Sequence, residues 1–318
     1  MPVRMVRSPQ APRRIARPFV LVETGLLKGE HSWRVRSVAV SANGTIASAS
    51  SDKSVCIWSK ERLLQKLTGH SGEVNGVVFV EYGSQQFLVS GGSDKTLRVW
   101  DIASGGKSLH VFEDAHRGDV SALAFSTQKS ASVVSGSADK NLKLWSLDEA
   151  GVLTEQRKLS GHKDAVTAVA SSSDGSLIAS SSYDGTLRLW SATQGIELRS
   201  IGHSAPVTAL AIAPDAKTVV TGTNDGALRL WSGSDGTLLF EMIRAHSDKV
   251  SSLCYVDSAC VASGGRDDHV RLHSLANGKQ LAASKNHVDC VVSLAIAHDG
   301  SFLASGAHDQ TVRLWRVH

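Results

Sequence analysis

The sequence lacks the features that would place it in a membrane or in a disulfide-rich secreted class. No apolar run approaches the roughly 20 residues of a membrane-spanning helix. No apolar core of about 7–15 residues follows Met1, so we expect no secretory signal. The four cysteines, Cys56, Cys254, Cys260 and Cys290, form no C-x-x-C pair. This scarcity favours reduced thiols in an intracellular protein.

Proline is also scarce, and its distribution marks out the beginning of the chain. Four of the six prolines, Pro2, Pro9, Pro12 and Pro18, fall within residues 1–18, where they would interrupt any helix. Residues 1–22 contain no acidic side chain, and the rest of the chain carries 29 basic and 30 acidic residues. The excess positive charge therefore lies in a predicted basic arm, residues 1–18, with Arg4, Arg7, Arg13, Arg14 and Arg17.

Three interpretations of this arm stay open at the level of sequence. It could be a solvated tail, or a basic tether for RNA or for an acidic protein surface. It could also be a mitochondrial presequence, although it is poor in serine and interrupted by proline. We expect an intracellular protein, in the cytoplasm, with a mitochondrial location if the arm is a presequence.

After the arm, the chain repeats one pattern seven times. Histidines recur at His31, His70, His116, His162, His203, His246 and His287, each followed four residues later by valine. Hydroxyl side chains recur at Ser48, Ser90, Ser135, Ser180, Thr221, Ser263 and Ser305. Four residues after each hydroxyl stands an aspartate, at Asp52, Asp94, Asp139, Asp184, Asp225, Asp267 and Asp309. Six residues further stand Trp58, Trp100, Trp145, Trp190, Trp231, His273 and Trp315, spaced by 42, 45, 45, 41, 42 and 42 residues.

A period of 40–45 residues with this signature resembles the WD-repeat family of β-propellers, which have four strands in each blade. The resemblance covers about residues 19–318. It departs from the family pattern at His273, which replaces a tryptophan, and only Trp100-Asp101 is a literal Trp-Asp pair. It implies that each His, hydroxyl, Asp and Trp set forms a hydrogen-bonded structural tetrad.

The predicted fold is therefore all-β: a single seven-bladed propeller at residues 19–318, with four antiparallel strands in each blade. In the fourth unit we expect strands at 165–170, 177–181, 186–190 and 196–201. The last unit ends three residues after Trp315, and an unpaired strand at about 19–27 precedes the first unit. We expect this strand to complete the last blade and so remove the open edges of the ring. The expected blade cores are 29–69, 70–115, 116–161, 162–202, 203–245, 246–286 and 287–318 plus 19–28.

The recurring Ser, His and Asp do not predict a hydrolase. A nucleophile needs one activated hydroxyl, and the sequence has no G-x-S-x-G elbow. His269 and His273 lie four apart on a predicted strand, about 13 Å from one another, so they do not form a metal pair. We expect no catalytic residues, no metal and no cofactor.

The resemblance also implies that partners dock on the ring face that carries the tetrad turns. The positions that reach this face lie three and five residues after each tetrad histidine and one before each tetrad aspartate. The predicted partner-binding residues are Trp33, Arg34, Arg36, Glu73, Asn75, Asp119, Tyr183, Asn224, Lys249, Arg266 and His308. Their charges favour a basic sector from the sixth to the first blade, suited to an acidic peptide or a phosphate-bearing partner. A solvated rim of mixed charge is the alternative that the sequence leaves open.

The expected function is a non-catalytic scaffold that mediates protein–protein interactions within an intracellular multiprotein assembly, with the propeller itself monomeric. The alternative is an RNA- or ribonucleoprotein-associated subunit anchored by the basic arm. Salt-sensitive RNA binding that disappears with residues 1–18 would distinguish the alternative from the scaffold.

Overall fold

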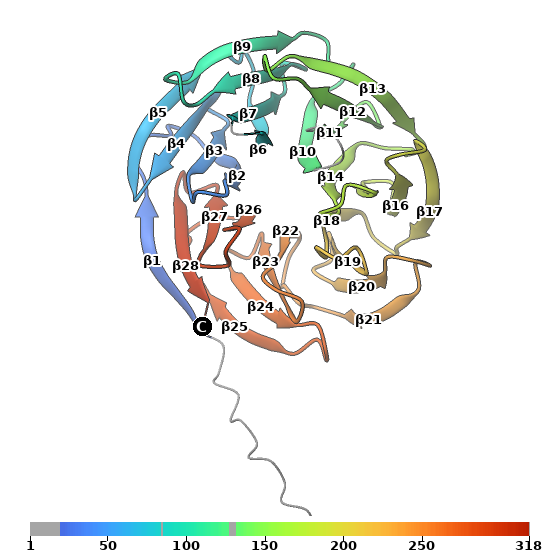
Figure 1. The fold of residues 1–318 in the computed structure, drawn as a ribbon. Coiled ribbons are helices and arrows are strands. Elements are labelled where there is room, and N and C mark those ends of the chain that lie inside the picture. The colour runs from blue at the N-terminus through green and yellow to red at the C-terminus, as the bar shows by residue number, and fades with distance from the viewer. Residues whose placement is uncertain (1–19, 84, 127–131, 318) are drawn as a thin grey trace, which may run out of the picture.

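The protein folds as a closed ring of seven four-stranded antiparallel sheets around a common axis (Figure 1). The hollows along this axis form a central channel. The structure is a computed structural model, and it describes residues 20–83, 85–126 and 132–317. The predicted arm, residues 1–18, lies outside the described residues, so its boundary with the ring stays a prediction. The described part of the chain contains no helix long and apolar enough to cross a bilayer.

Each of the first three blades is formed by four consecutive strands. The first blade contains β2 (Val35–Val40), β3 (Ile46–Ser50), β4 (Ser54–Ser59) and β5 (Arg62–Thr68). The second contains β6 (Val74–Tyr82), β7 (Gln85–Gly92), β8 (Leu97–Asp101) and β9 (Lys107–Phe112). The third contains β10 (Val120–Ser126), β11 (Ser132–Ser137), β12 (Asn141–Leu147) and β13 (Leu153–Ser160).

The next three blades repeat this arrangement. The fourth contains β14 (Val166–Ser171), β15 (Leu177–Ser182), β16 (Thr186–Ser191) and β17 (Ile196–Gly202), each within a residue or so of the strand predicted for it. The fifth contains β18 (Val207–Ile212), β19 (Thr218–Thr223), β20 (Leu228–Ser232) and β21 (Leu238–Met242). The sixth contains β22 (Val250–Tyr255), β23 (Cys260–Gly265), β24 (Val270–Ser274) and β25 (Gln280–Ser284).

The seventh blade joins the two ends of the ring. It contains β26 (Val291–Ile296), β27 (Leu303–Ala307), β28 (Val312–Val317) and β1 (Leu21–Leu27), in the order β1-β28-β27-β26. β1 pairs antiparallel with β28, with Leu21 opposite Val317 and Leu27 opposite Val312. The prediction that the first strand closes the ring is confirmed.

The hydrophobic core lies mainly between neighbouring blades. One cluster combines Ala47 and Val55 of the first blade with Val74 and Trp100 of the second. The valine four residues after each tetrad histidine packs against the preceding blade at close range. At Gly222 of β19, for example, an added Cβ would lie 2.4 Å from Cγ1 of Val250, so this contact requires glycine. The first strands of adjacent blades contact one another around the ring and line the channel.

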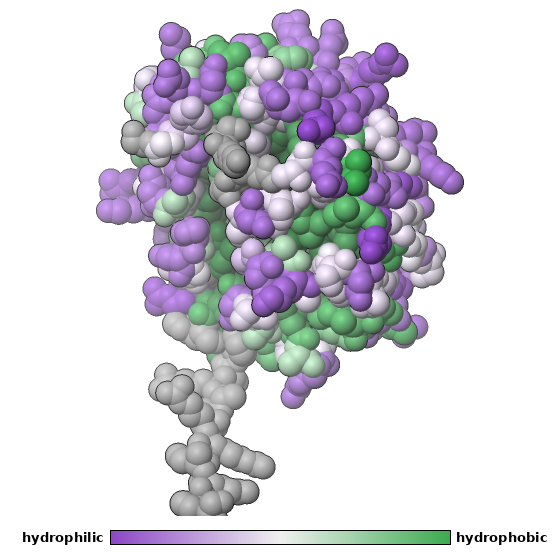
Figure 2. All heavy atoms as spheres, turned by 45° about the vertical axis from the view of Figure 1, so that its right-hand side comes forward, coloured by the Kyte–Doolittle hydropathy of each residue, from purple (hydrophilic) through white to green (hydrophobic). Residues whose placement is uncertain are grey.

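The outer wall of the ring is a mixture of polar and apolar side chains. Figure 2 shows green, hydrophobic patches that reach the solvent among purple, hydrophilic ones. The outer strands β17 and β21 contribute Ile196, Leu198, Leu238 and Leu239, which are 39–51% exposed. The channel and its two mouths, rather than this wall, gather residues from all seven blades.

Candidate functional site

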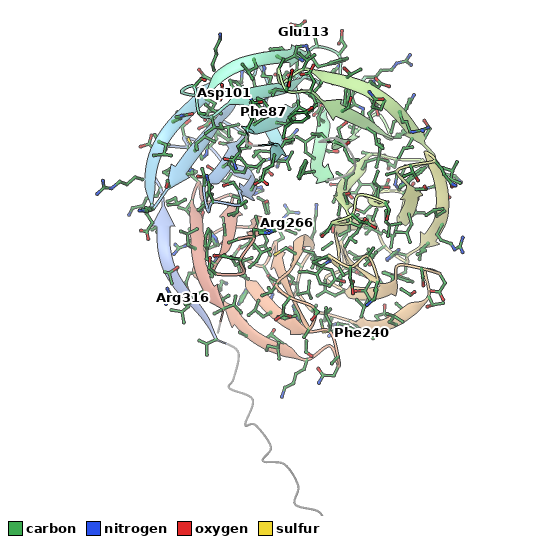
Figure 3. The ribbon with its side chains drawn as sticks, in the orientation of Figure 1. Phe87, Asp101, Glu113, Phe240, Arg266 and Arg316 are labelled. Carbon is green, nitrogen blue, oxygen red and sulfur yellow. The ribbon has the colours of Figure 1, made fainter. Side chains whose placement is uncertain are left out.

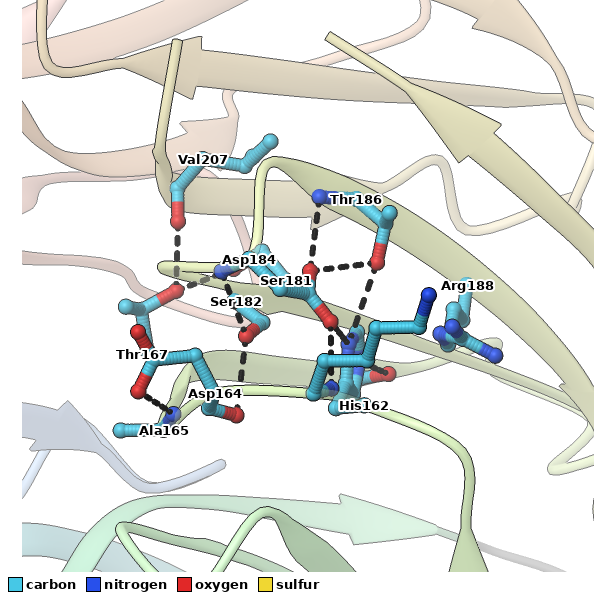
Figure 4. A network of polar contacts seen from close by, with 12 residues as sticks. His162, Asp164, Ala165, Thr167, Ser181, Ser182, Asp184, Thr186, Arg188 and Val207 are labelled. Carbon is cyan, nitrogen blue, oxygen red and sulfur yellow. Dashed lines mark hydrogen bonds and ion pairs between the residues drawn. The ribbon is translucent and has the colours of Figure 1, made fainter.

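The predicted tetrad residues meet inside each blade in a chain of buried hydrogen bonds. In the fourth blade, the Trp190 indole N–H donates to Ser180 Oγ at 2.8 Å, and Ser180 Oγ lies 2.7 Å from His162 Nε2. His162 Nδ1 lies 3.0 Å from the Asp184 carboxylate, as part of the network in Figure 4. Because the hydroxyl accepts from the indole, its own proton goes to Nε2, so Nδ1 carries the hydrogen that reaches Asp184.

The tetrad ionisations follow from this arrangement. Burial alone would raise the pKa of Asp184, but hydrogen bonds from Thr186, the Lys163 amide and His162 lower it to about 2. Burial lowers the pKa of His162, so the imidazole is neutral at pH 7. A neutral imidazole with both ring nitrogens hydrogen-bonded and a buried hydroxyl together form a structural brace.

The same bonds recur in the other blades. The His Nε2 to hydroxyl distance is 2.7–2.9 Å in all seven sets. The Trp Nε1 to hydroxyl distance is 2.8 Å in each of the six sets that contain tryptophan. His Nδ1 lies 2.8–3.1 Å from the carboxylate in six sets.

The fifth blade departs from the expected tetrad. His203 Nδ1 lies 3.3 Å from the Ile201 carbonyl, and no bond to Asp225 is found among the described residues. Asp225 instead accepts from the Thr223 hydroxyl at 2.5 Å. In the fourth blade the hydroxyl of Thr186, two residues after the aspartate, holds the carboxylate, but the fifth blade has Ala227 at this position. The prediction of a His203–Asp225 hydrogen bond is therefore wrong. Burial lowers the pKa of His203 to about 4.

The sixth blade keeps its tetrad with a histidine in place of tryptophan. His273 Nε2 lies 2.8 Å from Ser263 Oγ, in the role of the indole N–H, while Ser263 Oγ lies 2.7 Å from His246 Nε2. His273 is 1% exposed, and its Nδ1 is buried without a hydrogen-bond partner. Burial, with the nearby His246 and Arg271, lowers the pKa of His273 to about 3.

The predicted partner-binding residues gather at one mouth of the channel. A hollow of about 840 Å³ there is lined by Arg36, Glu73, Asn75, Asp119, Tyr183, Lys249, Arg266 and His308. Figure 3 shows Arg266 at the edge of the central channel. Trp33, Arg34 and Asn224 are exposed but lie outside this lining, with Trp33 59% exposed. The structure thus brings most of the predicted set together and leaves these three at its periphery.

A pattern that was not predicted divides the channel wall into two parts. In the second to fifth blades, the residue five after each tetrad histidine bonds to a backbone carbonyl of the next blade. These bonds run from Asn75 to Val120, Ser121 to Val166, Thr167 to Val207 and Thr208 to Val250, at 2.6–3.0 Å. Figure 4 includes the Thr167–Val207 bond.

In the sixth, seventh and first blades the link moves by one residue. Ser252, Ser293 and Ser37, six residues after the histidine, accept hydrogen bonds from the amides of Leu294, Val38 and Val77, at 2.9–3.3 Å. The other blades carry glycine or alanine at this position. Arg36, Ser251 and Val292 are thus not needed for the inter-blade carbonyl bond. A serine six residues after the tetrad histidine is the sequence signal that could have revealed this division.

These three blades also carry the basic sector, which we define as Arg34, Arg36, Lys249 and Arg266 with His308. Arg36 lies 3.8 Å from Glu73, whereas no ion pair of Arg34, Lys249 or Arg266 is found among the described residues. Lys249 Nζ lies 5.6 Å from the centre of the Tyr183 ring. Burial lowers the pKa of His308, and the charges of Arg34, Arg36 and Arg266 lower it further, while Asp289 opposes the shift.

One cluster in this sector has the composition of a metal site. The candidate ligand atoms of Asp289, Cys290 and His308 all lie within 4.8 Å of one another. These residues come from two turns that are separated in the sequence, so no local motif predicts the cluster. The positive charges of Arg34, Arg36 and Arg266 act on His308, and they would disfavour the binding of a metal cation by this cluster. Burial raises the pKa of Cys290, which keeps its thiol protonated at pH 7, in the form that does not bind metals.

The fold and this arrangement define the class: a β-propeller with hydrogen-bonded braces inside its blades. The family model "WD domain, G-beta repeat" matches residues 22–59, 61–101, 106–146, 153–191, 195–232, 236–274 and 278–316. The chain belongs to this WD40 repeat family, whose propellers bind other proteins and generally serve as non-catalytic scaffolds.

Individual relatives are similar over part of the chain only. The nuclear distribution protein PAC1-1 of Uncinocarpus reesii is 38% identical over 82 residues, 26% of this chain and 18% of the relative. The nuclear distribution protein nudF of Aspergillus terreus is 33% identical over 90 residues, 28% of this chain and 20% of the relative. The aligned segments therefore span about a fifth of these relatives.

Proposed function

We propose that this protein is a non-catalytic scaffold that holds an acidic segment of another protein on its basic sector, within an intracellular assembly. The observation that carries the proposal is the division of the channel wall. In the second to fifth blades the side chain five residues after the tetrad histidine bonds to a backbone carbonyl of the next blade, and no such carbonyl bond is found in the other three blades among the described residues. Arg36 instead lies 3.5 Å from Asn75 Oδ1 and 3.8 Å from the Glu73 carboxylate. These three blades present Arg34, Lys249 and Arg266, for which no ion pair is found among the described residues. A hydrogen bond from the Cys290 amide lowers the pKa of Asp289 on the seventh blade, and the charge of Arg34 lowers it further.

The chemistry of the face suits a protein partner. Arginine and aromatic side chains dominate the energetics of protein interfaces. Trp33 and Val288 are 59% and 82% exposed and lie on the first and seventh blades, beside the arginines. An acidic segment with an apolar side chain would place its carboxylates on the sector and its apolar group on this edge. Glu73 and Asp119, on the second and third blades, would repel it and so orient it.

The partial relatives are nuclear distribution proteins, and this similarity supports our proposal of a scaffold role in a cytoplasmic multiprotein assembly. No described feature favours RNA over protein as the partner. The mitochondrial interpretation of the arm likewise has no support from the relatives.

The test is affinity capture with a charge-reversed ring. The triple variant Arg34→Glu, Arg36→Glu, Arg266→Glu is expected to lose the partners that the native chain captures. The matched control reverses three exposed charges on the outer wall, Lys158→Glu, Arg199→Glu, Lys279→Glu, and should retain them. Equal capture of partners by both triple variants would contradict the proposal that the basic sector binds them. The captured segments are then treated with phosphatase and tested again. Binding that is lost after treatment identifies phosphate as the acidic group, and binding that is retained identifies carboxylate.

A further inference from the structure

The channel has a second mouth, at the opposite end of the strands from the tetrad turns. A hollow of about 710 Å³ opens there, lined by residues at or beside the turns that join the first and second strands of six blades, and by Phe125 of β10 in the third blade. Its lining includes the aromatic residues Phe79, Phe125 and Tyr255. Phe79 and Tyr255 are 6% and 7% exposed and form an apolar floor.

The rim of this hollow is acidic. Glu81 and Asp257 line it and are exposed, and no lysine or arginine is among the described residues that line it. Asp174 and Asp299 add exposed carboxylates from the same set of turns, and Asp215 is paired with Lys217 at 3.2 Å. The corresponding turn of the third blade, residues 127–131, lies outside the described part. We call the hollow and its rim the acidic mouth. It is the electrostatic opposite of the basic sector.

The strand pairing of the seventh blade places the start of β1 at this same end of the ring. Leu21 lies opposite Val317. Two residues earlier in β28, Trp315 lies opposite Leu303, and Leu303 lies opposite Ile296, which lines the acidic mouth. The chain before Leu21 therefore joins the ring on the side of the acidic mouth.

The preceding segment has both the length and the charge to occupy this mouth. Three strand spacings, about 14 Å in all, separate β1 from β26 at the channel wall. The 18 residues of the arm could span about 60 Å if fully extended, which is well beyond this separation. The arm carries five arginines and no acidic residue. Like charge excludes it from the basic sector, and opposite charge favours the acidic mouth.

We propose that residues 1–18 dock in the acidic mouth of their own ring. The arginines pair with Glu81 and Asp257 at the rim, and an apolar side chain of the arm, such as Ile15, lies against Phe79 and Tyr255. Tethering makes this step intramolecular, with an effective concentration of about 1 mM, so even weak charge pairing suffices. The arm thus occupies one mouth of the channel and leaves the basic sector of the other free for an acidic partner. This inference is independent of the proposed function, because it concerns the opposite face.

The first test locates the arm in the full chain. A photoreactive benzoylphenylalanine at Ala11 is irradiated, and the crosslinked peptides are identified by mass spectrometry. We expect crosslinks at the turns near residues 79–81, 255–257 and 296–300. Crosslinks confined to the tetrad face, or spread without preference over the ring, would overturn the proposal. A mixture of heavy- and light-isotope protein reports which chain is crosslinked, and crosslinks only between chains would also overturn it.

The second test measures binding of the arm as a separate peptide. A synthetic peptide of residues 1–18 is titrated into the chain that lacks those residues but keeps β1. We expect saturable binding that weakens as salt is added, and a loss of about two- to five-fold for each of Glu81→Gln and Asp257→Asn. The matched variants Glu73→Gln and Asp119→Asn, on the other face, should bind as the unsubstituted ring does. A peptide with all five arginines replaced by glutamine should not bind. Loss of affinity on the tetrad face alone, or unchanged affinity in all four variants, would contradict the proposal.

Discussion

The substitution His273→Trp should stabilise the ring and remove a source of acid sensitivity. His273 occupies the position that holds a buried tryptophan in the other six tetrads. Its Nδ1 is buried without a partner, and one unsatisfied polar atom typically costs about 1–3 kcal/mol. The indole donates its one N–H to Ser263 and leaves no polar atom unpaired. We therefore expect His273→Trp to raise the free energy of unfolding by about 1–3 kcal/mol at pH 8.

The advantage of the variant should grow as the pH falls. The pKa of His273 is lowered from 6.5 to about 3. Between these values the unfolded chain binds a proton that the folded chain does not, so stability decreases as the pH decreases. Each pH unit below 6.5 costs about 1.4 kcal/mol, so the penalty from this residue reaches about 2 kcal/mol at pH 5. The penalty is absent above pH 6.5 and reaches its full value only below about pH 3.

Urea unfolding at pH 8, 6.5 and 5, followed by tryptophan fluorescence and circular dichroism, measures both effects. The difference between variant and native protein should increase by about 2 kcal/mol from pH 8 to pH 5. The reciprocal variant Trp190→His is the control, and should introduce the same acid sensitivity into the fourth blade. A stability difference that does not change with pH, or a destabilised His273→Trp at pH 8, would refute the reasoning from burial and the unpaired nitrogen.

Three further perturbations test the ring itself. Asp184→Ala should lower the unfolding free energy by about 1–3 kcal/mol, because His162 and the Lys163 amide lose their acceptor; a loss below about 0.5 kcal/mol in urea unfolding would contradict this. Thr167→Val should cost about 1 kcal/mol through the lost bond to the next blade, with Thr167→Ser as the control that retains it; equal stability of the two variants would contradict the inter-blade role. Deletion of residues 1–28 should give an unstable or aggregating protein, because it exposes the edge of β28; cooperative melting at an unchanged temperature would contradict closure by β1.

The architecture could be predicted because the information is local and repeated. A half-buried strand shows alternating apolar residues, and the turn residues between strands recur with the tetrad at nearly constant spacing. The seven units therefore determine the number of blades and the strands within each. Closure by residues 21–27 could be predicted as well, because a ring with one strand missing at its end and one extra at its start has a single economical pairing.

The departures could not be predicted because they depend on contacts between units. The contact of His203 with the Ile201 carbonyl, in place of Asp225, occurs in the blade that has Ala227 two residues after the aspartate, where the fourth blade has the hydroxyl of Thr186. The division of the channel wall depends on a carbonyl or amide in the next blade, which a single repeat does not reveal. The proximity of Asp289 to His308 likewise arises only when two turns of the seventh blade meet.

The central claim is that an acidic partner binds the basic sector on the tetrad face. The most direct measurement is the dissociation constant of one captured partner segment for the native ring, for the Arg34→Glu, Arg36→Glu, Arg266→Glu variant and for the outer-wall control. With about 1 kcal/mol lost for each reversed charge, the sector variant should bind about 100-fold more weakly, while the control binds as the native ring does. Equal affinity for all three rings would contradict the claim.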